Sequence, residues 1–580
     1  MTEKGMMDKI VDLVFSKKNI KWVILLMVLA FILRFLLANN IGFLGDEMVH
    51  GPHAIGILKT NVLSRMTQSI VWFYLTDLAH KIFGVSAFSS RFLSIFFGVL
   101  SIPLVYLVGK EFYNEKIGLL AAFFLAISSF TIRYTLIEMD LAALFFILLS
   151  LLFFIKSAKK GKFSYLSAFF IGIGGLIKLS AFFFIPGMLI WFFLIQEKPK
   201  KIFKKRKWNL LWFLIIISLM MLPILSYNYF LYKDKGIVDV YLSKFFNINR
   251  EIYAYQSGID ITFNFKDLFL GGPKMLWSLI KLDPLLMGLG ILGIFLMFLK
   301  KDKKNKSLLL FSILFPFLLL SISVLLQTHF TIIMPFISIF AAAFISKLTN
   351  NFENKKILYI SLIIILLVNI YLVFPHMNSQ AATIKTRDYA EKNIPNNALV
   401  LVDGRFYTGR AAWMFYDKHY LSINYLPEVS AILGNSSSQE IPLETYFIEC
   451  SQDDCGWGTI ADQPEFNQSM EDLANYVKQG AVLEKTFYGG GNYDETAGQK
   501  SIQIYKKTLL LKPEILSLAD STHYWWQYSV NYEQESYDSY VVYGAFNNAL
   551  DILSHFILYI SIFFAIISPV FIIYLWKKYN

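Results

Sequence analysis

The chain has 580 residues, 56% of them hydrophobic, and a formal net charge of +12. Together with a mean hydropathy of +0.51, this composition excludes an ordinary soluble domain and is typical of a protein that crosses the membrane several times. The basic excess does not indicate nucleic-acid binding, because Lys and Arg residues are scattered between apolar runs instead of being gathered on one face.

Apolar runs that are long enough to cross a bilayer recur along the chain, and we expect about twelve transmembrane helices. Short basic segments such as residues 198–207 and 300–306 separate these runs. Because basic loops mark the cytoplasmic face, both termini and these segments are predicted to be cytoplasmic. The first run is too long for a signal peptide and lacks a small-residue cleavage site, so we expect a retained anchor. The expected spans begin near Trp22, Phe92, Ile117, Thr135, Phe163, Ala181, Trp208, Leu285, Ser307, Thr331, Ile357 and Leu550.

The predicted topology divides the chain into a membrane domain (residues 1–375), an extracytoplasmic domain (376–548) and a last transmembrane helix (549–580). The extracytoplasmic domain contains 22 Asp and Glu against 12 Lys and Arg, a net charge of −10, which leaves +22 for the rest of the chain. At this length the domain can bury a core of its own. We predict an all-α membrane domain and an α/β or mostly β extracytoplasmic domain.

Within these parts, local patterns predict individual elements. Outer loops are expected at residues 42–90 and 229–273, and apolar residues at helical spacing predict an interfacial helix over residues 70–83 of the first loop. In the extracytoplasmic domain, residues 398–402 and 501–505 have the apolar or alternating pattern of short strands.

The only two cysteines, Cys450 and Cys455, both fall in the extracytoplasmic domain. In an oxidising compartment, two cysteines this close in sequence predict a local disulfide. A metal site is disfavoured there, since no His and Cys cluster accompanies them.

Two acidic pairs lie beside apolar runs and fall on the outer side of the predicted topology. They are Gly45-Asp46-Glu47 and Glu138-Met139-Asp140. Ionisable groups in such places are costly, so both pairs are candidates for a functional site. Cations are expected at the outer ends of other spans, and His50 and His53 stand close to Asp46 in sequence. The cationic candidates are Arg34, Arg91, Lys178 and His329.

Carboxylates at the outer membrane surface suit cation transport, peptide cleavage or group transfer from a lipid-linked donor. Transporters place ionisable residues near the middle of the bilayer, often in repeated halves, and this chain shows no such repeat. An intramembrane protease needs a nucleophile, paired-aspartate or metal motif within its spans, and none is present in the sequence. Group transfer needs a carboxylate as general base and cations for a phosphate leaving group, and the chain offers both.

An ordered series of short segments resembles the GT-C superfamily of polytopic glycosyltransferases, in the branch of the protein O-mannosyltransferases and lipid A aminoarabinose transferases. The series covers roughly the first 350 residues. Its segments are Leu33-Arg34-Phe35, Gly45-Asp46-Glu47, Lys81-Ile82-Phe83-Gly84, Ser90-Arg91-Phe92-Leu93, Tyr106-Leu107-Val108-Gly109-Lys110, Glu138-Met139-Asp140, Gly174-Gly175-Leu176-Ile177-Lys178 and the stretch from His329 to Pro335.

The resemblance implies an inverting enzyme that transfers one sugar, mannose or a related one, from a polyprenyl phosphate to an extracytoplasmic hydroxyl of a protein, lipid or glycan. Asp46 would act as the base and Glu47 as its helper. A divalent cation, Mg²⁺ or Mn²⁺, bridging Asp46, Glu138 and Asp140 is left open. The residues implied in donor or acceptor binding are Glu138, Asp140, Arg91, Lys178, His329, Arg34 and His53.

Two other functions remain open. Block transfer of an oligosaccharide from a lipid diphosphate would keep the fold, but Tyr524-Trp525-Trp526-Gln527-Tyr528 lacks the aspartate of the Trp-Trp-Asp signature of oligosaccharyltransferases. A polyprenyl-linked substrate transporter, or a scaffold subunit without catalysis, would tolerate a neutral residue at Asp46.

Overall fold

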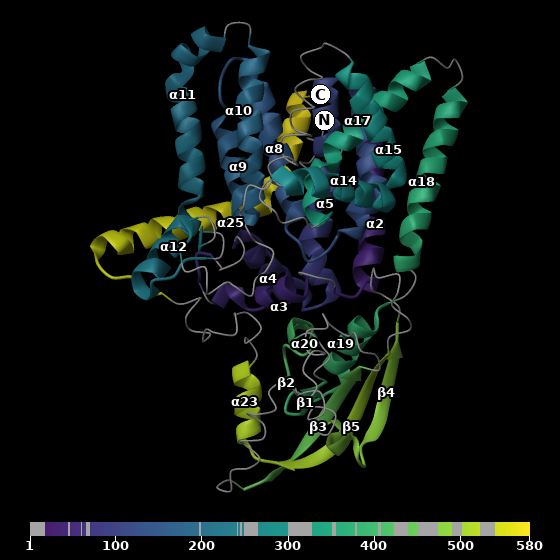
Figure 1. Ribbon diagram of the computed structural model, residues 1–580, viewed down its shortest axis with the longest axis vertical. Coiled ribbons are helices and arrows are strands. Elements are labelled where there is room, and N and C mark those ends of the chain that lie inside the picture. Colours follow the sequence, from purple (N-terminus) through teal and green to yellow (C-terminus); the bar gives the residue numbers. More distant parts are fainter. Residues whose placement is uncertain are drawn as a thin grey trace, which may run out of the picture.

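The computed structural model is mostly helical and ends in a small sheet region followed by one long helix (Figure 1). The structure describes residues 18–43, 47–59, 61–64, 70–196, 199–239, 242–243, 246–248, 265–299, 327–350, 355–377, 380–403, 408–422, 439–450, 474–489, 501–522 and 540–579. Asp46 and Cys455 lie outside these described residues, as do the span expected from Ser307 and the aromatic stretch 524–528.

The centre of the helical bundle is α8, whose apolar side chains are buried on all sides. α8 packs against α5 and α9, and α5 packs in turn against α2 and α6. The bounds of the first half of the bundle are α2 (Lys18–Asn40), α5 (Ala87–Phe112), α6 (Glu115–Ile127), α7 (Ser129–Arg133), α8 (Asp140–Ala158), α9 (Tyr165–Ile177), η2 (Leu179–Phe183) and α10 (Phe184–Ile195). Those of the second half are α11 (Pro199–Met220), α12 (Leu222–Lys235), α14 (Phe265–Leu282), α15 (Pro284–Phe298), η4 (Gln327–Ile333), α17 (Met334–Asn350), α18 (Lys355–Met377) and α25 (Ala545–Tyr579).

Helix starts in the bundle follow local capping chemistry. Ser86 opens α5 with a capping box, in which its hydroxyl accepts from the Ser89 amide and the Ser89 hydroxyl accepts from the Ser86 amide. Asn114 is the N-cap residue of α6, and its side-chain oxygen accepts a hydrogen bond from the amide of Ile117. These caps fix where α5 and α6 begin, and α5 carries Ser90 and Arg91 in its first turns.

Within the described residues, five helices are long and apolar enough to cross a membrane, or six if the bent pair α11 and α12 counts as one span. The five match the expected spans near Trp22, Phe92, Thr135, Thr331 and Leu550. Four shorter apolar helices and the 13-residue α6 occupy further expected positions. The total of about twelve spans therefore stays a prediction.

Two helices lie across the end of the bundle nearest the sheet region, α3 (Glu47–Ala54) and α4 (Val71–Phe83) (Figure 1). The helix expected over residues 70–83 is confirmed as α4, and it is followed by Gly84 with φ +74°. A single 3-10 turn, η1 (Ile57–Lys59), packs against α4. In the loop expected at 229–273, the structure has helix at both ends, because α12 continues to Lys235 and α14 begins at Phe265.

The sheet region comprises five strands with α19, α20 and α23. The strand order is β2-β1-β3-β5-β4, with β1 parallel to both neighbours and β5 antiparallel to both of its own. The strands expected at 398–402 and 501–505 are confirmed as β1 and β5. The bounds are α19 (Ala382–Asn393), β1 (Leu399–Val402), α20 (Thr408–Met414), β2 (His419–Ser422), β3 (Ile441–Cys450), β4 (Val482–Tyr488), β5 (Ser501–Leu511) and α23 (Glu514–Thr522).

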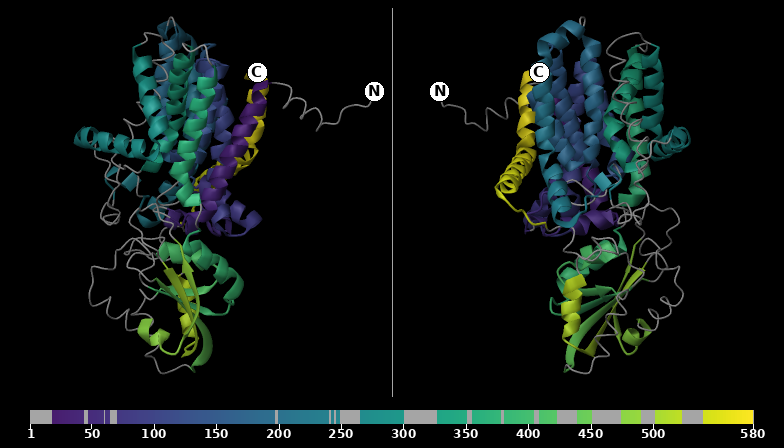
Figure 2. Two further views of the ribbon diagram at one scale, coloured as in Figure 1. Left: turned by 90° about the vertical axis from the view of Figure 1, so that its right-hand side faces the viewer. Right: turned by 60° about the vertical axis from the view of Figure 1, so that its left-hand side comes forward.

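Alternate residues of the strands face two different cores, so the sheet is covered on both sides. Leu399 and Leu401 pack with Ile515 of α23, whereas Val400 and Val402 belong to the large core that continues into α19, α20 and the bundle. This mixed sheet with helices on both faces is of the α/β kind. Figure 2 shows the sheet region beyond the end of the bundle that carries α3 and α4.

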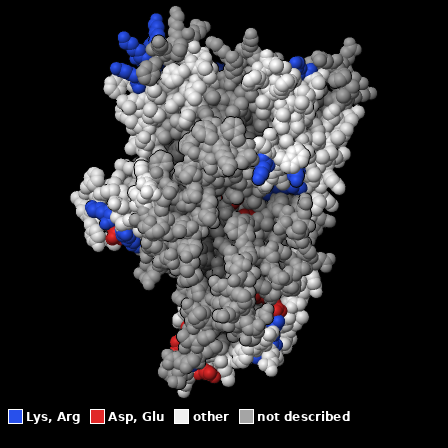
Figure 3. Space-filling model, in the orientation of Figure 1, with Lys and Arg blue, Asp and Glu red and all other residues white. Residues whose placement is uncertain are grey.

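The end of the bundle far from the sheet carries basic residues. α2 begins and α25 ends at the far end from the sheet, where Asn19 donates to Glu115 and the ring of Trp576 stacks on Tyr106. Lys110 and Lys156 lie at the same end, near the close of α5 and α8. On the face shown in Figure 3, most visible Asp and Glu side chains lie on the sheet region.

Candidate active site

The sequence-predicted site residues that the structure describes lie mainly at the end of the bundle that faces the sheet region. Glu47 is the first residue of α3, Arg91 is in the first turns of α5, and Asp140 is the first residue of α8. Glu138 stands just before α8, and Lys178 lies at the break between α9 and η2.

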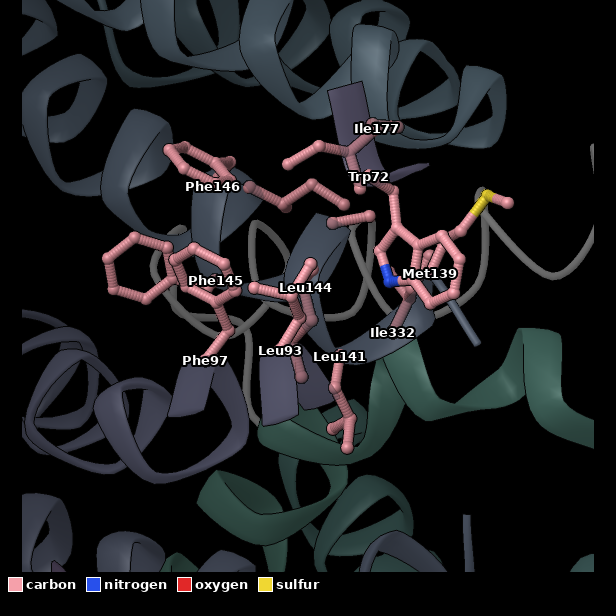
Figure 4. Close-up of a cluster of buried hydrophobic side chains, with 14 of the residues drawn as sticks. Trp72, Leu93, Phe97, Met139, Leu141, Leu144, Phe145, Phe146, Ile177 and Ile332 are labelled. Carbon is pink, nitrogen blue, oxygen red and sulfur yellow. The ribbon is translucent and has the colours of Figure 1, made fainter. Parts of the chain in front are cut away.

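Helices α4, α5, α8 and α9 and the turn η4 contribute to one apolar cluster. Figure 4 shows Met139 and the first residues of α8 beside Trp72 of α4, Ile177 of α9 and Ile332 of η4. These side chains are all buried. Met139 separates Glu138 from Asp140, and Ile177 precedes Lys178. The cluster therefore brings this acidic pair close to Lys178.

Glu47 and Arg91 form a buried ion pair in which both carboxylate oxygens are used. Arg91 Nε donates to Glu47 Oε1 and Nη2 donates to Oε2, each at 2.8 Å. The Ile137 amide donates to the same Oε1 at 2.7 Å. The neighbour of Asp46 is thus held by α5 and by the segment that leads to Glu138.

The remaining donors of Arg91 are also occupied. Nη1 donates to the carbonyls of Ala38 (2.6 Å) and Ile41 (2.7 Å), and Nη2 donates to that of Gly42 (3.0 Å). With the two bonds to Glu47, all five N–H groups of the guanidinium have protein acceptors. Arg91 therefore has no donor left for a phosphate or an acceptor sugar. It ties the end of α2 to the start of α3, although the sequence pattern suggested a ligand role.

The segment before α8 is held from two sides. The Ser94 hydroxyl lies 2.7 Å from the Leu136 carbonyl and 2.9 Å from the Glu138 carbonyl. His50 Nδ1 lies 3.3 Å from the Ile137 carbonyl and 3.6 Å from Glu138 Oε2. Glu138 therefore contacts α3 through an imidazole, which brings it close to the helix that begins at Glu47.

Asp140 and Lys178 form a second buried ion pair. Lys178 Nζ donates to Asp140 Oδ2 at 2.7 Å, and the two side chains are 11% and 3% exposed. Lys178 has an extended backbone between α9 and η2, so its side chain leaves the helix at a break in the apolar segment. Asp140 Oδ1 is buried and has no hydrogen-bond partner among the described residues.

Arg34 lies apart from the acids. Its guanidinium is fully buried and donates to the carbonyls of Ala30, Leu125 and Ala126 and to the Thr131 hydroxyl. Among the described residues, no carboxylate lies within ion-pair distance of it. Arg34 thus joins α2 to the α6–α7 corner inside the bundle.

Two further predicted site residues are histidines, His53 and His329. His53 is buried in α3, with its ring 6.2 Å from that of Phe73 of α4. His329 is in η4, which packs against α8 and is followed by α17. Their donor- or acceptor-binding roles stay predictions.

A metal site is likewise a prediction. Among the described residues there is no group of three or more His, Cys, Asp or Glu side chains that could hold an ion. Asp46, one of the three expected ligands, lies outside the described residues, and Asp140 is paired with Lys178. In the sheet region, Cys450 is in a disulfide bond, and its predicted partner Cys455 lies outside the described residues.

One contact at this site has no signal in the local sequence. Trp413 of α20 reaches across to the bundle, where its Nε1 donates to the Ser90 hydroxyl at 3.1 Å. The two residues are 323 positions apart. No periodicity or motif pairs them, and only the folded chain brings them together.

Comparisons with known proteins found a family match, a relative and similar solved structures. Residues 67–227 match the family model described as dolichyl-phosphate-mannose-protein mannosyltransferase. The matched stretch contains Arg91, Glu138, Asp140 and Lys178, and it ends before His329. An uncharacterized protein of Aquifex aeolicus (strain VF5) is 26% identical over 235 residues, which are 38% of this chain and 45% of that protein. The chain thus spans less than half the length of this curated relative.

Solved structures of other proteins are also similar to this chain. The crystal structure of ArnT from Cupriavidus metallidurans bound to undecaprenyl phosphate is 11% identical, with a TM-score of 0.51, over 83% of this chain and 98% of that one. The oligosaccharyltransferase of Archaeoglobus fulgidus is 13% identical, with a TM-score of 0.45, over 82% and 80%. The family match and the fold shared with ArnT confirm the resemblance of this chain to the GT-C membrane glycosyltransferases of the protein O-mannosyltransferase and aminoarabinose transferase type.

Proposed function

We propose that this chain is an integral membrane glycosyltransferase that moves a single sugar, mannose or a related one, from a polyprenyl phosphate to a hydroxyl on the outer side of the membrane, with inversion. The observation that carries the proposal is the buried set of Glu47, Glu138, Asp140 and Lys178 at one end of the bundle, which lies largely within the family match. ArnT, whose fold this chain shares, has a solved structure bound to undecaprenyl phosphate.

Asp46 would act as the general base. Its neighbour Glu47 is fixed by Arg91 and by the Ile137 amide, and both oxygens of Glu47 are engaged. Glu47 is therefore the anchor of the segment, and Asp46 is the carboxylate assigned to the chemistry. Asp46 would take the proton of the acceptor hydroxyl as its oxygen attacks the anomeric carbon. The new carbon–oxygen bond forms on the face opposite the phosphate, which inverts the configuration.

Lys178 would stabilise the leaving group. The bond from the anomeric carbon to the phosphate oxygen breaks, its electron pair stays on the phosphate, and negative charge grows there. An ammonium group has three N–H donors, and Asp140 is the one side-chain acceptor of Lys178 among the described residues. The other donors can meet the phosphate. His329 is the second proposed cation. Arg91 and Arg34 would be structural, because Arg91 donates to Glu47 and to carbonyls, and Arg34 donates to carbonyls and to the Thr131 hydroxyl.

The proposed orientation follows from charge. The end of the bundle where α2 begins and α25 ends carries Lys110, Lys156 and Lys578. Basic residues at the ends of transmembrane helices mark the cytoplasmic face. The site and the sheet region then lie on the outer side, where a hydroxyl on a protein, lipid or glycan acceptor would reach Asp46.

The experiment that tests this function uses purified full-length protein in liposomes and a panel of polyprenyl-phosphate sugars. Release of free polyprenyl phosphate is followed for wild type, Asp46→Asn and the control Glu514→Gln, an exposed acid of α23. We expect release from one donor by wild type and by the control, and release at least about 100-fold slower by Asp46→Asn. Binding of donors without release by any of the three would favour the transporter or scaffold alternative, and release from lipid diphosphate oligosaccharides alone would favour block transfer.

A further inference from the structure

Trp413 of the sheet region is buried in the end of the helical bundle. It lies in α20, which packs against α3, and its side chain is only 1% exposed. α20 stands between the sheet and α3 in Figure 1. The indole thus belongs to the sheet region by sequence, but its contacts are with the helical bundle.

The indole ring of Trp413 packs on Phe43, the last described residue before Asp46. The rings of Trp413 and Phe43 have centroids 4.0 Å apart, tilted by 45°. The guanidinium carbon of Arg91 lies 5.1 Å from the centroid of the same Phe43 ring. Phe43 therefore contacts both Trp413 and the arginine that anchors Glu47, and such close contacts allow these side chains little freedom.

The same indole also approaches the helix that follows Asp46. A Cβ atom at Gly51 of α3 would lie 3.1 Å from a ring atom of Phe43 and 3.7 Å from Cδ1 of Trp413. Glycine at this position lets α3 come close to both rings. Trp413 thus contacts the chain on both sides of residues 44–46.

A hydrogen bond fixes the indole to α5. Its Nε1 donates to the Ser90 hydroxyl, which also lies 3.0 Å from Nε2 of His80 in α4. Ser90 directly precedes Arg91. The hydroxyl can accept from Trp413 and donate to His80, so one serine joins α20, α4 and α5.

We infer that Trp413 is a positioning residue for the proposed active site: it holds Phe43, the Ser90–Arg91 turn and α3, and with them the ion pair between Arg91 and Glu47. The inference rests on the proposed function. It assigns the sheet region a part in catalysis without contact to the donor, because the indole acts through Phe43, Ser90 and Arg91.

The test compares Trp413→Phe, Trp413→Ala and Ser90→Ala with the control Trp208→Phe, an exposed tryptophan of α11. Trp413→Phe loses one neutral hydrogen bond and should lower kcat by about 3- to 10-fold, with the KM for the donor unchanged. Ser90→Ala also loses the bond to His80, so its kcat should fall by at least as much. Trp413→Ala, which also loses the packing on Phe43, should lower kcat by at least about 30-fold. Trp208→Phe should behave as wild type. In the double variant Trp413→Phe/Ser90→Ala, the losses should not multiply, since both remove the same bond.

Hydrogen exchange of the same proteins provides a readout that does not need turnover. Trp413→Ala should speed exchange in peptides that cover residues 41–55 and leave α8 and α17 protected. Faster exchange there together with lower kcat supports the inference. Unchanged exchange, unchanged kcat, or a loss confined to donor KM overturns it. If wild type itself transfers no sugar, the proposed function fails, and the exchange data alone then decide whether Trp413 holds this segment.

Discussion

The ammonium of Lys178 lies 2.7 Å from the carboxylate of Asp140, and both side chains are almost fully buried. The pair joins the break after α9 to the first residue of α8. An unpaired charge in this position would be costly, and each residue supplies the opposite charge that the other needs. The pair also leaves N–H donors of Lys178 unused among the described residues, which suits the proposed site for a phosphate.

Replacing Lys178 separates its structural role from its proposed catalytic role. Lys178→Met leaves Asp140 as an unpaired buried charge and should destabilise the protein by about 3 kcal/mol. The double variant Lys178→Met/Asp140→Asn should recover most of the thermal unfolding midpoint, because no lone charge remains. Turnover should stay at least about 100-fold below wild type in both, since the proposed cation for the phosphate is absent. Wild-type turnover in the stable double variant would remove Lys178 from the mechanism.

Arg91 should affect kcat and stability, and not donor affinity. Arg91→Lys cannot reproduce the bidentate bond to Glu47 and leaves carbonyls of α2 without donors, so we expect destabilisation by about 3 kcal/mol. Because all five N–H groups of Arg91 face the protein, the KM for the donor should stay within about 3-fold of wild type while kcat falls. The measurement is a donor titration of both proteins, with Lys507→Gln in β5 as a control. A rise in donor KM alone would show that Arg91 contacts the phosphate.

Stability should fall below neutral pH because of His80 in α4, outside the spanning helices. Burial lowers the pKa of His80 from 6.5 to about 4, although the charge of Asp77 opposes the shift. The unfolded chain therefore binds a proton that the folded chain excludes. Stability is complete above pH 6.5 and falls by about 1.4 kcal/mol for each pH unit between 6.5 and 4. His80→Gln, which does not titrate, should show a smaller fall in unfolding midpoint between pH 7 and pH 5; equal falls would refute the assignment.

Removal of divalent cations should leave turnover unchanged. Lys178 already compensates the charge of Asp140, and Arg91 that of Glu47, so these two acids have cationic partners within the chain. We expect the same rate of sugar release with EDTA as without it. Loss of activity with EDTA, restored by Mg²⁺ or Mn²⁺, would instead support an ion held by Asp46, Glu138 and Asp140.

The parts predicted from sequence depend on local signals. The helix at 70–83 and the strands β1 and β5 follow from apolar spacing, and Asp140 and Lys178 stand out because charges in apolar runs are rare. The role of Arg91 could not be predicted, because its acceptors are mainly backbone carbonyls that only the folded chain brings near it. The contact between Trp413 and Ser90 likewise depends on tertiary structure. Short helices such as α6 are the reason that the number of spans cannot be read from length alone.

The central claim is that Asp46 removes the proton of the acceptor. The most direct measurement is single-turnover sugar release in proteoliposomes loaded with the active donor, for wild type and Asp46→Asn, with donor binding measured on the same samples. The account predicts that Asp46→Asn binds the donor as wild type does and reacts at least about 100-fold more slowly, as loss of a general base typically causes. A near-normal rate in Asp46→Asn would contradict it.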